Sequence, residues 1–316
     1  MDVLSDVITT LRTGHPGGAR AWWEPPWGVR FADQPGTAGF LVLLQGSAWL
    51  LADASEPVAV TPGDVILSPR GDGYALADSS ARVVDPLPVA SEPVQEGRPG
   101  PTATVTLCGG YTLDPDRTHP LLRELPATIH LPSRIGQHAR LRAAVDILGE
   151  EIDGDQLGSD AIVPMALDML LFYVLRAWLG SRPATGRATG WAAALADPAI
   201  RGALDAIHGD PAHAWTVQEL AQHASLSRAA FSRRFSTLVG EPPLTYLTWW
   251  RMTTAACLLR DSTDPLAAIA TRVGYGSEFA FANAFKRHHG LAPGQFRRRA
   301  RTAPPALAGH ERVLTR

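Results

Sequence analysis

The fold of the C-terminal third is decided by a segment that occurs twice, ELAQHASLSRAAFSRRFSTLVGEPP at residues 219–243 and AIATRVGYGSEFAFANAFKRHHGLAP at residues 268–293. Apolar residues, glycines and prolines recur in register. Leu220 and Ala221 match Ile269 and Ala270 at an offset of 49, and Phe231, Phe235, Gly240 and Pro243 match Phe281, Phe285, Gly290 and Pro293 at an offset of 50. An internal repeat indicates one structural unit used twice. The second copy has one additional residue, which we place in a turn.

Each copy predicts a helix, a tight turn and a second helix. In the first copy Thr216 and Glu219 have the spacing of a capping box, and Ser227 is the expected N-cap of the following helix. In the second copy we expect Asp264 and Ser277 as the two N-caps. The second helix of each copy buries its phenylalanines and has a polar outer face, which fits the major groove of DNA. Two such motifs are a stronger signal than one, because many helical domains contain a single motif without touching DNA.

The pattern over residues 191–299 resembles the DNA-binding domain of AraC-family transcriptional regulators, and VGYGSEFAFANAFKRHHGLAPGQFRR (273–298) is similar to the signature region of that family. The resemblance implies that two recognition helices on one rigid domain enter successive major grooves. It places the base-reading positions at Ala229, Ser232, Arg233, Glu278, Phe279 and Asn283. Phosphate contacts, or simply a solvated face, are expected at Arg228, Arg234, Lys286, Arg287, Arg297 and Arg298.

The chemistry of the base-reading positions differs from residue to residue. Arg233 can bind guanine and Asn283 adenine through two hydrogen bonds, and Glu278 can accept one from cytosine, each contributing about 1–3 kcal/mol of discrimination. Ala229 offers only a contact to a thymine methyl. Phe279 has two interpretations, a methyl contact or packing on the neighbouring helix.

The N-terminal half predicts β-structure, because short apolar runs over residues 20–135 are separated by Pro, Gly, Asp and Ser. The stretches 62–78 and 108–132 resemble the cupin-type sensor domain found in some of these regulators. Metal-binding cupins use histidines on facing strands, but the corresponding positions here are Leu41 and Tyr74. We therefore expect no metal, no cofactor and no enzymatic activity.

Two kinds of residue in this half allow more than one interpretation. Cys108, together with His119 and His130, is either a buried strand residue near unrelated polar groups or a redox-sensitive thiol. Four tryptophans either line an effector pocket or fill the barrel: Trp22, Trp23, Trp27 and Trp49.

The remaining segments complete the organisation. Residues 136–180 predict two helices, the second apolar nearly all round, which pack on the strands, pair two subunits, or do both. We expect a loop at 85–101, a flexible linker at 181–190 and a disordered tail at 300–316. The predicted fold is α+β with two domains: a cupin-like barrel at 1–135 followed by helices, and an all-α domain with two helix-turn-helix motifs.

Charge and cysteine content agree with this organisation. The 316 residues have a formal net charge of −2, which divides into −8 for residues 1–190 and +6 for residues 191–316, so the C-terminal part is the one suited to a polyanion. Two cysteines exclude a disulfide framework and indicate a reducing compartment, hence the cytoplasm. The start lacks a basic secretory signal, and no run reaches the roughly 18 apolar residues of a membrane span.

The sequence thus predicts a homodimeric, sequence-specific transcriptional regulator that binds promoter DNA. We expect its barrel to respond to a small molecule or a redox signal, with RNA polymerase as a further partner if it activates transcription. The alternatives are a barrel enzyme fused to a DNA-binding domain and an architectural DNA-binding protein that responds to no effector.

Overall fold

The structure is a computed structural model that describes residues 2–51, 56–80, 99–113, 119–133, 138–153, 157–181 and 190–302. Within these ranges the side chains of residues 10–15, 301 and 302 are not described. Most of the predicted loop (85–101), linker (181–190) and tail (300–316) lies outside the described residues, but residues 300–302 are helical and so do not belong to a disordered tail.

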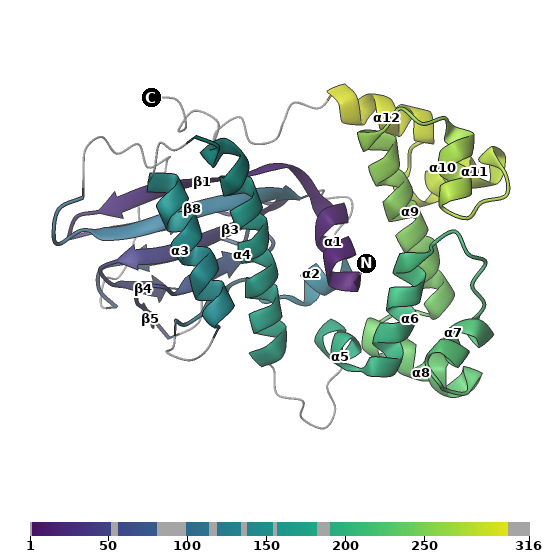
Figure 1. Cartoon of the computed structure of the whole chain (residues 1–316), viewed down its shortest axis with the longest axis horizontal. Helices are drawn as coiled ribbons and strands as arrows, with labels where there is room; N and C mark the ends of the chain where they lie inside the picture. The colour runs from purple at the N-terminus through teal and green to yellow at the C-terminus, as the bar shows by residue number, and fades with distance from the viewer. Residues whose placement is uncertain are drawn as a thin grey trace. The chain divides into compact units, whose positions relative to one another are not determined.

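In the described part of the N-terminal half, nine strands form two sheets (Figure 1). Their bounds are β1 Arg12–Trp23, β2 Gly28–Phe31, β3 Thr37–Gln45, β4 Ala48–Leu51, β5 Val58–Val60, β6 Val65–Ser68, β7 Tyr74–Ala77, β8 Thr104–Leu113 and β9 Ile129–Leu131. One sheet has the order β1-β8-β3-β6-β9 and the other β2-β7-β4-β5. The strands pair antiparallel in β2–β7, β3–β6, β3–β8, β4–β5, β4–β7 and β6–β9.

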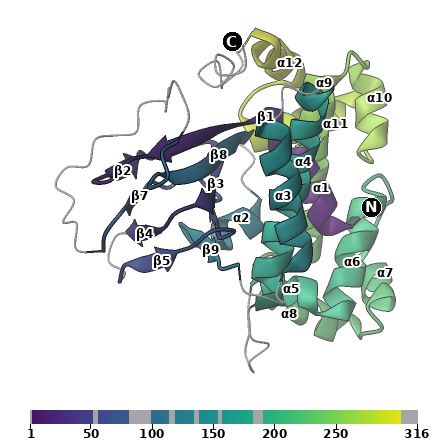
Figure 2. The same ribbon diagram turned by 60° about the vertical axis from the view of Figure 1, so that its left-hand side comes forward.

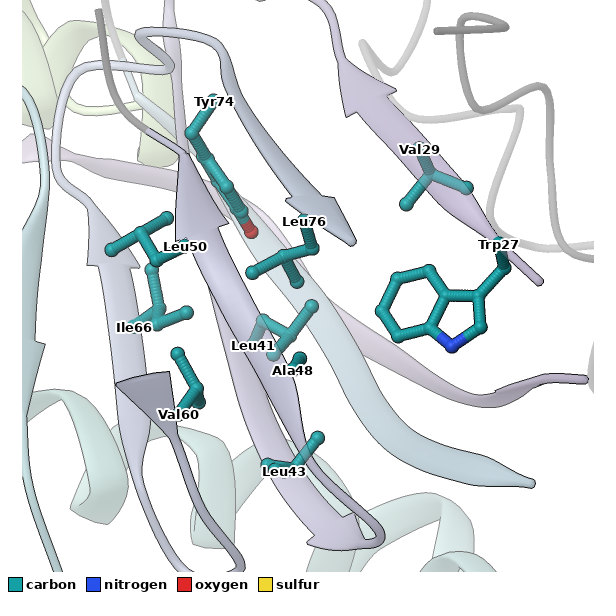
Figure 3. Packing of buried hydrophobic residues seen from close by; sticks show 10 residues of the cluster. All are labelled: Trp27, Val29, Leu41, Leu43, Ala48, Leu50, Val60, Ile66, Tyr74 and Leu76. Carbon is teal, nitrogen blue, oxygen red and sulfur yellow. The ribbon is translucent and has the colours of Figure 1, made fainter. Parts of the chain in front are cut away.

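A hydrophobic core lies between the two sheets, and Figure 3 shows ten of its side chains, contributed by strands of both sheets. Alternation along β3 turns Leu41 and Leu43 toward this core, because successive side chains of a strand point to opposite faces. Leu41 is fully buried, and Tyr74 lies against Phe31 with ring centroids 4.9 Å apart. The two positions where a metal-binding cupin has histidines are therefore part of an apolar core.

Two of the four tryptophans help to fill this core. Trp27 is 7 % exposed, and Trp23 stacks on it with ring centroids 5.7 Å apart. Trp49 alternates with the buried residues Ala48 and Leu50 on β4, so its side chain points to the other face.

Two helices follow the strands, α3 Ala139–Asp153 and α4 Ser159–Ser181, and Figures 1 and 2 both show them side by side. They pack on the strand-rich part through contacts such as the hydrogen bond that the Tyr111 hydroxyl of β8 donates to the Leu167 carbonyl of α4. An 18-residue window of α4 has a mean hydropathy of 1.7, although Asp168 and Arg176 interrupt its apolar residues. Core helices of soluble proteins can be equally apolar, and 39 % of this window is buried.

The remaining helices form a second compact unit. Their bounds are α1 Val3–Leu11, α2 Pro120–Glu124, α5 Trp191–Ala196, α6 Pro198–Gly209, α7 Val217–His223, α8 Arg228–Val239, α9 Pro243–Asp261, α10 Leu266–Arg272, α11 Glu278–His289 and α12 Pro293–Thr302. These elements confirm the predicted α+β fold with a strand-rich N-terminal region, following helices and an all-α C-terminal region. Helices α1 and α2 lie in the sequence range predicted for the sensor domain but pack in the helical unit, and the linear domain boundaries stay a prediction.

Candidate nucleic-acid interface

The first helix-turn-helix motif is α7 and α8. The predicted capping box is present: Thr216 Oγ1 accepts the Glu219 amide hydrogen at 3.1 Å, and Glu219 Oε2 accepts that of Thr216 at 2.8 Å. Ser227 caps α8 as predicted, with its Oγ accepting from Ala230 N at 3.3 Å. These hydrogen bonds use backbone donors that the helices leave unpaired at their starts. They define where α8 begins and therefore which residues lie in its first turn.

The second motif is α10 and α11, and it repeats the turn of the first. Leu226 N donates to Ala221 O at 2.9 Å in the first motif, and Tyr275 N donates to Ala270 O at 2.9 Å in the second. The additional residue of the second copy is therefore Gly276, directly before the N-cap of α11, and this confirms its predicted place in the turn.

One predicted cap of the second motif is wrong. Pro265, and not Asp264, is the N-cap of α10, which has no side-chain capping bond. The Asp264 carboxylate instead pairs with Arg272 at the other end of the helix, at 3.1 Å. Ser277 does cap α11, with its Oγ accepting from Ala280 N at 3.2 Å.

Ten of the twelve residues predicted to touch DNA belong to α8 and α11, and Arg297 and Arg298 belong to α12. Of the ten, Arg234 is described below, Ser232 is half-buried and the other eight are exposed: Arg228, Ala229, Arg233, Glu278, Phe279, Asn283, Lys286 and Arg287. The phenylalanines of the repeat, by contrast, are fully buried beneath them. Phe279 is 78 % exposed, which argues against the interpretation that it packs on the neighbouring helix.

Two of these residues occupy the same place in the two motifs. Arg233 and Asn283 are 50 residues apart, the offset of the second helix in the repeat. Within the described part of the chain, neither side chain makes a hydrogen bond or ion pair, so the donors of both face solvent. This arrangement leaves one arginine and one amide available at equivalent points of the two helices.

Arg234 is engaged inside the protein, unlike its neighbour. Its guanidinium pairs with the buried carboxylate of Asp197, with Nε donating to Oδ2 at 2.5 Å. Asp197 also caps α6, because its Oδ1 accepts from Ala199 N at 3.0 Å and Ile200 N at 3.2 Å. This ion pair joins α8 to the start of α6 and leaves the Arg234 side chain 53 % exposed, so the solvated face or phosphate contact expected there stays a prediction.

Elements from the N-terminal half complete the core around α9. Tyr246 of α9 shares its buried hydroxyl with two imidazoles, His119 Nε2 at 3.3 Å and His208 Nε2 at 2.7 Å. His119 directly precedes α2, and its ring lies 4.5 Å from that of Trp191 in α5. The carboxylate of Asp6 in α1 approaches His208 Nδ1 at 3.4 Å. Helices α1 and α2 are thereby connected to α5, α6 and α9.

Burial keeps both imidazoles of this network neutral. Desolvation lowers the pKa of His119 well below its usual value, and repulsion from Arg123, and from His208 whenever that ring is protonated, lowers it further. Desolvation also lowers the pKa of His208, although Asp6 opposes the shift. The surroundings of His119 and His208 therefore stabilise the uncharged form of both imidazoles.

The structure does not bring together Cys108, His119 and His130. Cys108 lies in β8 opposite Leu41, whereas His130 lies in β9 and pairs with Asp64 at 3.0 Å. Burial raises the pKa of the Cys108 thiol to about 11, against the lowering effect of a hydrogen bond with Thr106. Among the described residues, no group of three or more His, Cys, Asp or Glu is arranged to hold a metal ion.

Sequence reasoning missed the parts of this unit that come from distant segments. Helix α1 had a detectable signal, because Val3, Leu4, Val7 and Ile8 have helical spacing and all are buried. The dipeptide Asp197-Pro198 is likewise a recognisable helix start. No local pattern indicates that Arg234 or His119 would find its partner far along the chain.

Comparison with known proteins agrees with this architecture. A cupin family model matches residues 2–180, and a helix-turn-helix domain model matches residues 220–299. An AraC-like transcription regulator of Streptomyces antibioticus is 36 % identical over 303 residues, which cover 94 % of this chain and 99 % of that protein. The chain belongs to the AraC family of transcriptional regulators.

This AraC-family regulator is also similar to the RCS-specific transcriptional activator RclR of Escherichia coli, with 28 % identity over 90 % of this chain and 91 % of that protein. A solved structure, the DNA-binding domain of AdpA in complex with a target DNA, is 33 % identical over 34 % of this chain and 96 % of that chain, with a TM-score of 0.32. The relatives are transcription regulators and not enzymes, which confirms that expectation. They are bacterial proteins, in agreement with the cytoplasmic location expected from the sequence.

Proposed function

We propose that this AraC-family regulator reads an asymmetric DNA site with α8 and α11 in two successive major grooves. Base contacts come from Ala229, Ser232, Arg233, Glu278, Phe279 and Asn283, and phosphate contacts from Arg228, Lys286 and Arg287. The observation that carries the proposal is the pair Arg233 and Asn283, which are exposed and face solvent at equivalent points of the two helices. Arginine and asparagine are the side chains that bind guanine and adenine through two hydrogen bonds.

The test begins with the protein's own genome. Fragments that the purified full-length chain retains at near-physiological salt are sequenced to define the site, and binding is then measured for variants. We expect Arg233→Ala to weaken specific binding by about 1–3 kcal/mol and to relax the preference at one base. Lys286→Ala weakens all sequences alike and lowers the salt slope by about one.

The matched control is Arg201→Ala, which removes the same charge from an exposed position on α6, outside both recognition helices. We expect it to leave the preference at that base unchanged. Equal losses on specific and random DNA for Arg233→Ala contradict its role in reading a base.

The strand-rich unit is the proposed sensor, with a small molecule as its signal. The alternative signal is oxidation at Cys108. A reactive cysteine needs a lowered pKa, whereas burial raises that of the Cys108 thiol, so the surroundings favour the small-molecule signal. Cys108→Ser should leave regulation unchanged in the presence of an oxidant, and loss of an oxidant response in that variant would support the redox signal instead.

Helix α4 supports the proposal that the protein is a homodimer. Helix α4 is strongly apolar, yet part of its apolar surface is exposed: Met165 of α4 is 62 % exposed, and Ile147 of α3 is 44 % exposed. Exposed apolar helix surface of this kind is typical of a subunit interface. Met165→Glu should shift the sedimentation coefficient to that of a monomer. The control Asp160→Asn changes the charge by one at a position about 140° around the helix and should leave the dimer intact.

Promoter DNA is the proposed target, with RNA polymerase as a further partner if the protein activates transcription. The bound form is then part of the bacterial nucleoid. An architectural protein is the remaining alternative, and a site that is bound equally with and without every candidate effector would favour it.

A further inference from the structure

We infer that Arg251 and the turn at residues 210–213 lock the two helix-turn-helix motifs together, so that the spacing between the two halves of the DNA site becomes a determinant of specificity. The inference rests on the proposed function for its meaning. It concerns a positioning residue, because Arg251 lies on the linking helix α9 and outside the residues proposed to touch DNA.

Arg251 connects α9 to the turn that precedes the first motif. Its Nε donates a hydrogen bond to the Pro211 carbonyl at 2.7 Å, and its Nη2 donates to the His213 carbonyl at 2.8 Å. Hydrogen bonds from a charged donor are stronger than neutral ones, and the planar guanidinium fixes the direction of both. The two bonds hold the carbonyls of this turn at a defined position on the side of α9.

The turn is itself rigid and continues directly into α7. Asp210 Oδ1 accepts from Ala212 N at 3.1 Å and from His213 N at 3.0 Å, and the Asp210 carbonyl accepts from the indole of Trp215 at 2.8 Å. The next residue, Thr216, is the N-cap of α7. A restraint on the turn is therefore transmitted to the first motif without a flexible joint.

The second motif contacts the same turn through its own tight turn. Gly274 has a φ of +77° between α10 and α11, and a Cβ atom built on it would lie 2.6 Å from the Ala212 carbonyl oxygen and 2.8 Å from Arg251 Nη2. Only a residue without a side chain allows so close an approach. Arg251, the 210–213 turn and Gly274 thus form one bridge, which joins the two motifs in addition to α9.

A rigid connection of this kind has a consequence on DNA. Helix α9 has 19 residues and is about 28 Å long, and Figure 1 shows the motifs at its two ends. Successive major grooves are about 34 Å apart, and one inserted base pair moves the second groove by about 3.4 Å along the duplex and turns it by about 34°. If α8 and α11 are held at a fixed separation and orientation, a changed spacing costs the protein the base contacts of one motif. If the two motifs can instead pivot about α9, part of these contacts is kept.

The experiment measures binding of the full-length chain to its selected site and to sites with one or two base pairs inserted or removed between the two halves. For the wild-type protein we expect a loss of about 10-fold or more per altered base pair, the value of one good base contact. For Arg251→Ala the loss of affinity per altered base pair should be at least several-fold smaller. Its affinity for a site in which the sequence of one half is scrambled should equal that of the wild-type protein. The matched control Arg260→Ala removes the same charge from the same helix, where it pairs with the adjacent Asp261, and should retain the wild-type profile.

A second variant and a measurement without DNA keep the test decisive. Gly274→Ala separates the two turns without changing the charge, and it should flatten the profile in the same way if Arg251→Ala fails to fold. Spin labels on cysteines introduced at Thr237 of α8 and Lys286 of α11, with Cys108 and Cys257 replaced by serine, report the distance between the recognition helices. We expect a narrow distance distribution for the parent protein and a broader one after either bridge substitution.

The inference is overturned if both folded variants keep the width of the distance distribution, or if a broader distribution leaves the spacing profile unchanged. If no DNA motif is enriched at all, the proposed function fails. The distance measurement alone then decides whether the bridge locks the motifs.

Discussion

Asp197 offers the most informative single substitution, because its carboxylate serves two elements at once. One oxygen accepts two amide hydrogens at the start of α6, and the other pairs with the Arg234 guanidinium of α8. Replacement of an N-cap aspartate by alanine costs about 1 kcal/mol. Because the Arg234 side chain is 53 % exposed, solvent screens the ion pair and limits its contribution to about 1 kcal/mol or less. We therefore expect Asp197→Ala to lower the free energy of unfolding of the helical unit by about 1–2 kcal/mol.

Asp197→Asn separates the two contributions. Asparagine caps a helix about as well as aspartate, so only the ion pair is lost and the expected cost falls to about 1 kcal/mol or less. Both substitutions release Arg234 on a recognition helix. Binding to random DNA should therefore strengthen, and its salt slope should increase by about one phosphate contact.

The assay is hydrogen exchange of the α6 amides as a function of urea, combined with salt titrations of binding to random DNA. The variant Arg234→Ala is the control, because it removes the ion pair and the released charge together. Equal costs for Asp197→Ala and Asp197→Asn would refute the capping contribution. An unchanged salt slope in both would refute the conclusion that the ion pair withholds Arg234 from DNA.

Four further outcomes follow from the helical unit. Tyr246→Phe leaves the imidazoles of His119 and His208 without their shared partner and should lower stability by about 1–3 kcal/mol in a urea titration. Both histidines have a lowered pKa in the folded state, so their full contribution to the free energy of unfolding is present above the unfolded-state pKa near 6.5. As the pH drops from there toward the folded-state pKa values, the free energy of unfolding should fall by up to about 1.4 kcal/mol per pH unit for each histidine. Thermal melts at a series of pH values measure this fall. A chain restricted to residues 183–302 should melt below the temperature of the same unit in the full-length protein, because it lacks α1 and α2. Phe279→Ala should change stability by no more than about 0.5 kcal/mol while weakening specific DNA binding, and a large loss of stability would assign it to packing.

The double motif was predictable because its determinants are local. A capping box spans four residues, an N-cap serine acts on the amide three residues later, and the turn is closed by a hydrogen bond over five residues. Such features depend on residues that are close together in the sequence, and they could be recognised with certainty because they recur at a fixed offset. The exposure of Arg233 and Asn283 follows from helical periodicity alone. Asp264 shows the limit even here, since its carboxylate bonds to Arg272 and not to the helix start.

Side chains that act through partners distant in the chain could be assigned only from the tertiary structure. Arg233 and Arg234 are adjacent and chemically identical, but Asp197 engages one and leaves the other in solvent. His119 likewise acquires its role only from Tyr246, which lies beside it in space but 127 residues away in the sequence.

By itself the sequence determined the two helix-turn-helix motifs, because hydrogen bonds and periodicity among neighbouring residues decide them, and it determined the net charge of each half, which is a matter of composition. Only the tertiary structure decided that α1 and α2 belong to the helical unit, that Arg234 pairs with Asp197 and that Arg251 bridges the two motifs. Each of these features depends on contacts between residues that are distant in the sequence. Such contacts are stabilised by the burial and pairing of the two groups in the folded chain, and they produce no periodic pattern in the sequence around either group.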